Sequence, residues 1–275
     1  MTRKTAVAAV AGVLVVLGAA VSPGAPKPNL WERWQAHDPR STVRVDHTRW
    51  DSFLRSNVVT SHPSGVNRVR YGAVTNNDRE TLEEYLREME SVAVSGLSRS
   101  EQEAYWINIY NALTTKIVLE HYPVKSIRDI DISPGLFADG PWDAKLLTIE
   151  GEKVSLNDVE HRILRPLWKD NRHHYAVNCA SIGCPNLQPE AYTAENTGRL
   201  LNEGATAYVN HPRGVLLEGK KLTVSSIYDW FQVDFGGSPE GVIGHLLNYA
   251  GEPLRSELED FDGRVRDDYD WNLNE

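Results

Sequence analysis

The sequence predicts an α+β fold, with one helix-rich domain built around a central buried helix and short β-hairpins. Two observations support this class. Several stretches place apolar residues at helical spacing, whereas others alternate around a glycine as hairpins do. Helices and hairpins are scattered, without the regular alternation of parallel α/β folds and without an internal repeat. A length of 275 residues suits one large domain.

The N-terminal residues differ from the rest of the chain. Two basic residues precede an uncharged apolar run over residues 5–21, and Pro and Gly follow. This order is typical of a signal peptide or an N-terminal anchor, so residues 1–25 are excluded from the predicted fold. We expect an exported protein, whether periplasmic, extracellular or attached to the envelope, in which residues 26–45 form a linker and residues 46–275 the globular domain.

Composition and charge exclude some classes of partner. Apolar residues at 41% and charged residues at 24% are ordinary for a globular protein. The formal charge of −9 becomes −11 once Arg3 and Lys4 are removed with the N-terminal segment. Nucleic acid is a poor partner for such a surface. We expect no cofactor, and a small-molecule, peptide or cell-envelope ligand, with membrane contact only through an uncleaved N-terminal segment.

Three helices are predicted in the first half of the chain. Apolar spacing indicates helices over residues 46–59 and 78–92. The third runs from Ser98, which lies three residues before Glu101 as in a capping box, and ends before Pro123. Because it is apolar on nearly every face, we expect it to be the buried central helix.

Further elements follow the third helix. Hairpins are predicted to turn at Gly151 and Gly219, and a helix that Ser155 caps is predicted to end at Pro166. The predicted ranges are hairpins over 145–154 and 214–225, helices over 155–168, 193–211, 225–231 and 240–250, and a short apolar strand over 173–178.

The stretch "HHYAVNCASIGCP" at residues 173–185 contains both cysteines of the chain. Export favours a disulfide between Cys179 and Cys184, which would hold the shape of a small loop. Alternatively, Cys179 is a nucleophile, and the loop after it presents backbone N–H groups to an oxyanion. In a strand, His174 would share one face with Ala176 and Asn178, and His173 would lie on the other face. Strand geometry therefore does not by itself bring His174 to Cys179.

A second group of candidates lies on the helix predicted over residues 155–168. Glu160 and His161 are adjacent there, and a carboxylate beside an imidazole can orient it, as in catalytic triads. A metal site built from Glu160, His161, His174 and the two cysteines is a further alternative, although their spacing matches no zinc motif. We therefore assign no metal ligand. Serine hydrolase, Walker and dinucleotide motifs are absent from the sequence.

Several motifs together resemble the domain of unknown function 547 family. They are "YWINIYNALTTKIVLEHYPVKSI", "SLNDVEHRILRP", "HYAVNCASIGCPNL", "SSIYDWFQVDFG" and "YDWNLNE", and they extend from about residue 70 to the end. The family pattern falls on Trp106, Asn108, Tyr110, Asn111, Glu160, His161, His174, Asn178, Cys179, Ser181 and Cys184. The resemblance implies a domain but no established reaction. The resemblance also favours His174 over His173 as the functional histidine, because the family pattern more often has an apolar residue at position 173.

These residues give a working hypothesis. Cys179 attacks a carbonyl, His161 or His174 moves the proton and Glu160 orients that histidine, which corresponds to thiol-dependent acyl transfer or amide hydrolysis. The alternative is a non-catalytic binding module with a Cys179–Cys184 disulfide. Buried amides need hydrogen-bond partners, and two readings of Asn108 and Asn111 stay open, one as pins of loop backbone and one as ligand contacts. The candidate binding residues are Asn108, Asn111, Asn178 and Ser181.

Overall fold

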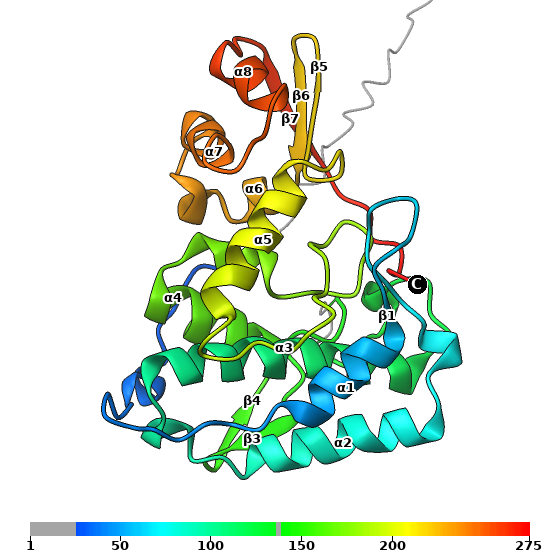
Figure 1. The fold of residues 1–275 in the computed structure, drawn as a ribbon, viewed down its shortest axis with the longest axis vertical. Coiled ribbons are helices and arrows are strands. Elements are labelled where there is room, and N and C mark those ends of the chain that lie inside the picture. Colours follow the sequence, from blue (N-terminus) through cyan, green and yellow to red (C-terminus); the bar gives the residue numbers. More distant parts are fainter. Residues whose placement is uncertain (1–25, 136–138) are drawn as a thin grey trace, which may run out of the picture.

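A computed structural model describes residues 26–135 and 139–275 and confirms the α+β class, with helices and small separate sheets. The segment expected to be a signal peptide or anchor, residues 1–25, lies outside the described residues. Figure 1 shows two stacked parts: α1 to α4 with β3 and β4 form one part, and α6 to α8 with β5 to β7 form the other, while α5 runs between them.

The predicted helices of the first half are present, with ends shifted by a few residues. The elements up to the middle of the chain are η1 (Glu32–Gln35), α1 (Thr48–Asn57), β1 (Val58–Val59), β2 (Arg68–Val69), η2 (Tyr71–Ala73), α2 (Asn76–Glu90), η3 (Val94–Gly96), α3 (Arg99–His121), η4 (Ile127–Asp129), β3 (Leu147–Ile149) and β4 (Glu152–Val154). The hairpin β3–β4 turns at Gly151, whose φ of 83° favours glycine.

Helix α3 is the buried centre of the first part, as predicted. Side chains are buried on all of its faces from Ala104 to Thr115, and Trp106 is fully enclosed. The capping box is only half formed. The hydroxyl of Ser98 accepts a hydrogen bond from the N–H of Glu101, but the Glu101 carboxylate accepts from the N–H of Val45 instead of returning to Ser98. A tertiary contact therefore replaces the local one.

The helix predicted over residues 155–168 does not end at Pro166. It is π-helical over η5 (Asp158–Leu164) and continues into α4 (Arg165–Trp168), which contains Pro166. Proline has no N–H and π-helical turns pair differently from α-helical ones, so some carbonyls near the junction need other donors. The N–H groups of Asn29 and Trp31 fill this role by donating to the carbonyls of residues 161 and 162.

The predicted linker therefore packs against the domain over part of its length. Residues 26–31 run along η5. Trp34 in η1 is only 2% exposed, and its ring centroid lies 5.0 Å from that of Trp106. Its Pro and Lys residues suggested a flexible segment, but the indole of Trp34 is an apolar anchor that the linker prediction overlooked.

The strand predicted over residues 173–178 is wrong. The chain forms a 3-10 turn, η6 (Asn171–Tyr175), which the Asp170 side chain caps by accepting from the N–H of Arg172, and then an irregular loop. A short apolar run is equally compatible with a strand and with any other buried segment, so the pattern could not distinguish them. Because these residues do not form a strand, the argument from side-chain alternation does not apply to His173 and His174.

The second part of the fold contains a three-stranded sheet. The elements from residue 197 onward are α5 (Thr197–Val209), β5 (Val215–Glu218), β6 (Lys221–Ser225), α6 (Ile227–Trp230), η7 (Gln232–Phe235), α7 (Pro239–Leu246), α8 (Leu254–Glu259) and β7 (Arg264–Asp268). The predicted β5–β6 hairpin is confirmed, whereas β7, which pairs in parallel with β6, and α8 were not predicted. Over residues 26–135 and 139–275, no helix has the length and apolar character needed to cross a bilayer.

Candidate functional site

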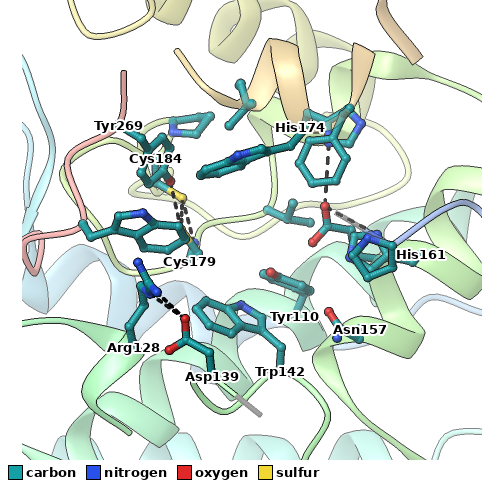
Figure 2. A pocket seen from close by; sticks show the side chains of 18 of the residues that line it. Tyr110, Arg128, Asp139, Trp142, Asn157, His161, His174, Cys179, Cys184 and Tyr269 are labelled. Atoms are coloured by element: carbon teal, nitrogen blue, oxygen red, sulfur yellow. Dashed lines mark hydrogen bonds and ion pairs between the residues drawn. The ribbon is translucent and has the colours of Figure 1, made fainter. Parts of the chain in front are cut away.

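A cavity of about 420 Å³ brings together residues from both parts of the fold. Six aromatic side chains line it: Tyr110, Trp142, Trp230, Phe231, Tyr269 and Trp271. Figure 2 shows Cys179 and Cys184 on one side of the cavity, His161 and His174 on another, and the Arg128–Asp139 ion pair as a further polar group. We call the place around Cys179 and Cys184 the thiol end, and the place around Glu160, His161 and His174 the carboxylate end.

At the thiol end the two sulfur atoms are adjacent. The Sγ atoms of Cys179 and Cys184 lie 2.6 Å apart, and both residues are free cysteines. The Cys179 sulfur also lies 3.1 Å from the Tyr269 hydroxyl and 3.2 Å from the Ser181 hydroxyl, and the N–H of Cys179 donates to the Cys184 sulfur at 2.9 Å. The pair can therefore exist as two thiols or, after oxidation, as a disulfide.

The loop that presents Cys179 is held in a strained conformation. Ala180 has a φ of 60°, in the left-handed region that residues with a Cβ seldom adopt. Its N–H donates to the Asn178 side chain at 2.8 Å, and its carbonyl accepts from the N–H of Asn274 at 3.1 Å. Strain of this kind persists only where the surroundings enforce it, and it is frequent at functional sites.

Hydrogen bonding sets the acidity of the thiol pair. Burial opposes ionisation, but hydrogen bonds from the Cys179 thiol, the Tyr269 hydroxyl and the Cys179 N–H lower the pKa of Cys184 to about 7. Burial and the neighbouring Cys184 raise the pKa of Cys179. The two thiols share protons, so the pair carries one negative charge near neutral pH. The negative charge is therefore mainly on Cys184, and Cys179, the more exposed of the two, can transfer its proton to the Cys184 sulfur as it reacts.

At the carboxylate end, Asp234 holds His174. The Nε2 atom of His174 lies 2.8 Å from Oδ2 of Asp234, which also accepts from Nε of Arg165 at 2.6 Å. Burial raises the pKa of Asp234, but its bonds to His174 and Arg165 outweigh this and lower it to about 2, so Nε2 is the donor. Nδ1 of His174 is then left facing Glu160. Burial lowers the pKa of His174, which favours the neutral ring.

Arg165 also fixes the second histidine. Its guanidinium donates to Nδ1 of His161 at 3.0 Å and to the carbonyl of Pro26 at 2.6 Å. Because Arg165 can only donate, the proton of the neutral His161 ring is on Nε2. Burial and the charge of Arg165 lower the pKa of His161 to about 3. Both histidines are thus uncharged at neutral pH and locked in orientation.

Glu160 is buried beside Tyr110, whose hydroxyl donates a hydrogen bond to it. It is 8% exposed and lines the cavity, but the histidine nitrogens nearest to its carboxyl oxygen Oε1 are 3.7 Å away in His174 and 4.0 Å away in His161, beyond hydrogen-bonding distance. Burial raises the pKa of Glu160, against the opposing charges of His174 and Arg165. A carboxyl group in this setting suits a proton donor.

The predicted convergence on Cys179 is only partly present. Glu160, His161 and His174 line the same cavity as Cys179, but no histidine nitrogen of the described chain hydrogen-bonds the Cys179 sulfur. The prediction of a direct contact between Cys179 and a histidine is therefore wrong, since Tyr269, Ser181 and Cys184 surround the Cys179 sulfur. Nor does Glu160 orient a histidine, because Asp234 and Arg165 do.

Comparison with known families identifies the middle of the chain. Residues 94–209 match the family described as "Protein of unknown function, DUF547". This segment is assigned to the DUF547 family. The matched segment includes both cysteines, Glu160, His161 and His174, whereas Asp234 and Tyr269 lie beyond it. No protein of curated function and no solved structure matches the chain.

Asn108, Asn111 and Asn178 bond backbone groups and do not line the cavity. Asn108 exchanges hydrogen bonds with the backbone of Tyr192, and Asn111 bonds the Ala176 carbonyl and the Asn178 N–H. Asn178 bonds the Pro185 carbonyl at 2.7 Å and the N–H of Ala180. These contacts support the backbone-pinning interpretation of Asn108 and Asn111, and Ser181 contributes by its hydroxyl near Cys179.

Three residues of the site were missed by the sequence analysis: Arg165, Asp234 and Tyr269. All three lie inside quoted motifs: Arg165 in "SLNDVEHRILRP", Asp234 in "SSIYDWFQVDFG" and Tyr269 in "YDWNLNE". His173 bonds Glu103 at 2.7 Å and is not among the residues that line the cavity. Among the described residues, no group of three or more His, Cys, Asp or Glu side chains is arranged to hold a metal ion.

Proposed function

We propose that this DUF547 protein is a thiol-dependent enzyme of acyl transfer or amide hydrolysis, exported and acting on a small-molecule or peptide substrate. One observation carries the proposal: a single cavity joins a thiol pair on a strained loop to a buried carboxyl group. A nucleophile and a proton donor on opposite sides of a bound carbonyl are the minimum that acyl transfer needs.

The reaction follows from the charge states at the two ends. The thiolate of Cys179 attacks the carbonyl carbon, and the bond to the leaving group breaks as Glu160 transfers its proton to that group. The product is a thioester on Cys179 and a carboxylate on Glu160. Water or an acceptor amine then attacks the thioester and returns a proton to Glu160, which restores the thiolate. The hydrogen bond from Tyr110 and the positive charge of Arg165 stabilise the Glu160 carboxylate between the two steps.

The proposal is tested with 4-nitrophenyl acetate. We expect a burst of 4-nitrophenolate and an acetyl group on Cys179, located by peptide mass spectrometry, and neither in Cys179→Ser. Glu160→Gln should slow cleavage of acetyl-4-nitroanilide about 100-fold or more, but hydrolysis of the ester only slightly, because 4-nitrophenolate leaves without protonation. Absence of acetyl-Cys179, or a burst that persists in Cys179→Ser, would overturn the proposal.

The adjacent sulfurs favour one second candidate, a binding module whose ligand loop is fixed by a Cys179–Cys184 disulfide. Titration of the unreduced exported protein with a thiol reagent separates the two. No titratable thiol before reduction, together with no burst after reduction, would favour the binding module. Two free thiols and a burst would favour the enzyme.

A further inference from the structure

Acyl transfer needs one sulfur nucleophile, but the thiol end holds two. Cys184 is 4% exposed, and its sulfur lies 2.6 Å from the sulfur of Cys179. The N–H of Cys179 also donates to the Cys184 sulfur at 2.9 Å. A second sulfur in contact with the first is not required to form or hydrolyse a thioester. It is required in disulfide exchange, because a second thiol must attack the mixed disulfide that the first one forms.

The loop that carries both sulfurs is closed by Asn178. The amide nitrogen of Asn178 donates to the carbonyl of Pro185 at 2.7 Å, and its side-chain oxygen accepts from the N–H of Ala180 at 2.8 Å. From outside, residues 270–274 hold the loop through backbone hydrogen bonds. The two sulfurs therefore meet without a rearrangement of the backbone, and each is at a high effective concentration for the other.

The two sulfurs differ in their access to a substrate. Both cysteines line the cavity of about 420 Å³, but Cys184 is buried whereas Cys179 is partly exposed. The hydroxyls of Tyr269 and Ser181 lie 3.1 Å and 3.2 Å from the Cys179 sulfur, and such donors stabilise a thiolate. A disulfide that enters the cavity would meet Cys179 first. This asymmetry makes Cys179 the attacking sulfur and Cys184 the resolving one.

We infer that Cys179 and Cys184 also form a dithiol redox centre, which reduces a small organic or peptide disulfide bound in the cavity. This activity goes beyond acyl transfer and does not rest on it. It also differs from the fixed disulfide of a binding module, because the bond between the two cysteines is made and broken in each cycle. While that bond is present, Cys179 is not available to attack a carbonyl.

The exchange balances in atoms and electrons. The Cys179 sulfur attacks one sulfur of the substrate, and its proton passes to the Cys184 thiolate. The other half of the substrate leaves as a thiolate and takes this proton from Cys184. The Cys184 thiolate then attacks the Cys179 sulfur, and the second half of the substrate leaves as a thiolate. The substrate has gained two electrons, the protein holds a Cys179–Cys184 disulfide, and an external dithiol restores the two thiols by the reverse exchange.

The test treats the reduced protein with bis(2-hydroxyethyl) disulfide in the absence of oxygen. The chain has 2 cysteines, so the products can be assigned completely by trapping free thiols with N-ethylmaleimide at timed points and by peptide mass spectrometry. The wild-type protein should reach the Cys179–Cys184 disulfide without accumulating a mixed disulfide, and dithiothreitol should restore both thiols. Cys184→Ala should stop at a mixed disulfide on Cys179. In Cys179→Ala, the buried Cys184 should react about tenfold more slowly or less.

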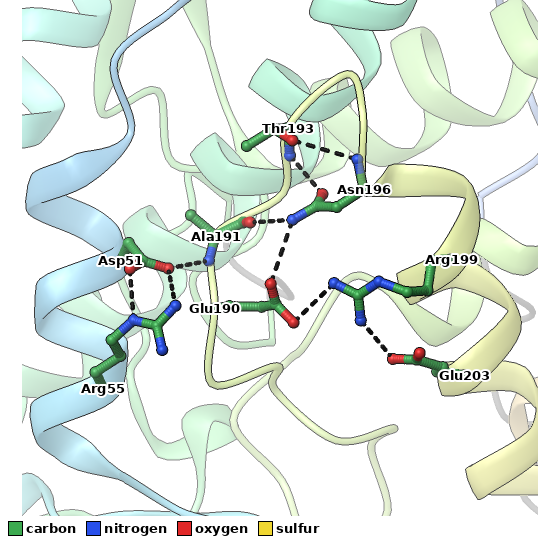
Figure 3. Close-up of polar contacts among 8 residues, drawn as sticks. All are labelled: Asp51, Arg55, Glu190, Ala191, Thr193, Asn196, Arg199 and Glu203. Atoms are coloured by element: carbon green, nitrogen blue, oxygen red, sulfur yellow. Dashed lines mark hydrogen bonds and ion pairs between the residues drawn. The ribbon is translucent and has the colours of Figure 1, made fainter.

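Matched variants separate the folded arrangement from the mere spacing of two cysteines. Asn178→Ala opens the closure of the loop, so the mixed disulfide should persist about tenfold longer or more. Asn196 holds another loop in the same way, since it donates to the Ala191 carbonyl and accepts from the Thr193 N–H (Figure 3). Asn196→Ala should therefore leave the exchange unchanged. The wild-type chain unfolded in urea, which keeps only the spacing, should also accumulate the mixed disulfide.

Three results would overturn the inference. They are a folded wild-type protein that stops at the mixed disulfide or does not react, equal rates in Cys179→Ala and the wild type, and a defect in Asn196→Ala as large as that in Asn178→Ala. No step of the exchange forms a thioester. Loss of the acetyl-enzyme with disulfide exchange retained would therefore reject the proposed function alone, and the reverse result would reject the redox centre alone.

Discussion

The two ends of the cavity are built in different ways, although one segment outside the central part of the chain supports each of them, residues 270–274 at the thiol end and residues 26–31 at the carboxylate end. The thiol end is local: Cys179 and Cys184 lie on one short loop, and residues 270–274 hold it by backbone hydrogen bonds, including those to Ile182 and Gly183. The carboxylate end is assembled from four segments, and charged side chains hold it together. Residues 26–31 brace it through the carbonyl of Pro26 and two N–H groups.

This difference explains how the reactive groups are tuned. At the thiol end, uncharged donors surround the sulfur atoms and favour the thiolate. At the carboxylate end, burial dominates, so Glu160 is driven toward its protonated form and both histidines toward their neutral forms. The cavity thus combines a nucleophile that ionises near neutral pH with an acid that retains its proton.

The largest expected effect is at the charged core of the carboxylate end. Arg165 is 5% exposed and bonds Asp234, His161 and the Pro26 carbonyl. Arg165→Met should lower the free energy of unfolding by about 3–5 kcal/mol, because it leaves Asp234 charged and half-buried without its partner. Urea unfolding measures the change. Arg128→Met is the control, since its pair with Asp139 is exposed and should contribute less than about 1 kcal/mol. Similar losses of stability in both variants would show that the buried Arg165 network contributes no more than the exposed Arg128–Asp139 pair.

The fold could be predicted from the sequence better than the network of hydrogen bonds that Arg165 and Asp234 make with the two histidines. Helix α3 could be predicted because its apolar residues, its Ser98 cap and Pro123 are all local features. The adjacent cysteines were also evident, since both lie in one short stretch. Asp234 and Arg165 could not be found in this way, because their partners are distant in the chain and an acid or an arginine is common on any surface.

Pro166 illustrates a second limit of local rules. A proline normally ends a helix, but here residues 26–31 supply N–H groups to carbonyls of η5, and the helix continues into α4. Likewise, residues 173–178 are apolar because they are buried, not because they form a strand. Local pattern predicted the burial of this segment but not its conformation.

Truncation tests the N-terminal brace. Removing residues 1–31 should lower the stability by about 2–4 kcal/mol, since it removes two backbone hydrogen bonds to η5, the Pro26 acceptor of Arg165 and the packing of Trp31. The melting temperature should fall by about 5–10 °C in a protein of this size. Removing residues 1–25 alone should leave it unchanged, and the alkylation rate of Cys179 should be the same in both truncated proteins. A full effect already present on removal of residues 1–25 would refute this assignment.

Acid should destabilise the carboxylate end before it affects the thiol end. The pKa of His161 is lowered to about 3 in the folded protein, against an ordinary value of 6.5. The unfolded chain therefore binds a proton first, and stability is lost as the pH falls from about 6.5 toward 3. His161→Gln retains an acceptor for Arg165 but does not titrate. Its stability deficit at pH 7 should shrink by about 1–3 kcal/mol at pH 4, measured by urea unfolding. A deficit that does not change with pH would show that His161 is not buried as a neutral ring.

The smallest effect concerns the proton shared at the thiol end. With Cys184 present, the pair ionises near pH 7, because each sulfur and the Tyr269 hydroxyl stabilise one negative charge. In Cys184→Ala that charge must be on Cys179 without the second sulfur, so its pKa should rise above the ordinary value for a thiol through burial. The rate of Cys179 alkylation by iodoacetamide should then fall about tenfold at pH 7, and the difference should narrow as the pH rises toward 9. Ser181→Ala, which keeps both sulfurs and Tyr269, should change the rate at pH 7 much less. An unchanged pH profile in Cys184→Ala would show that Cys179 ionises independently of its neighbour, and the thiol end would then owe its reactivity to the loop and Tyr269 alone.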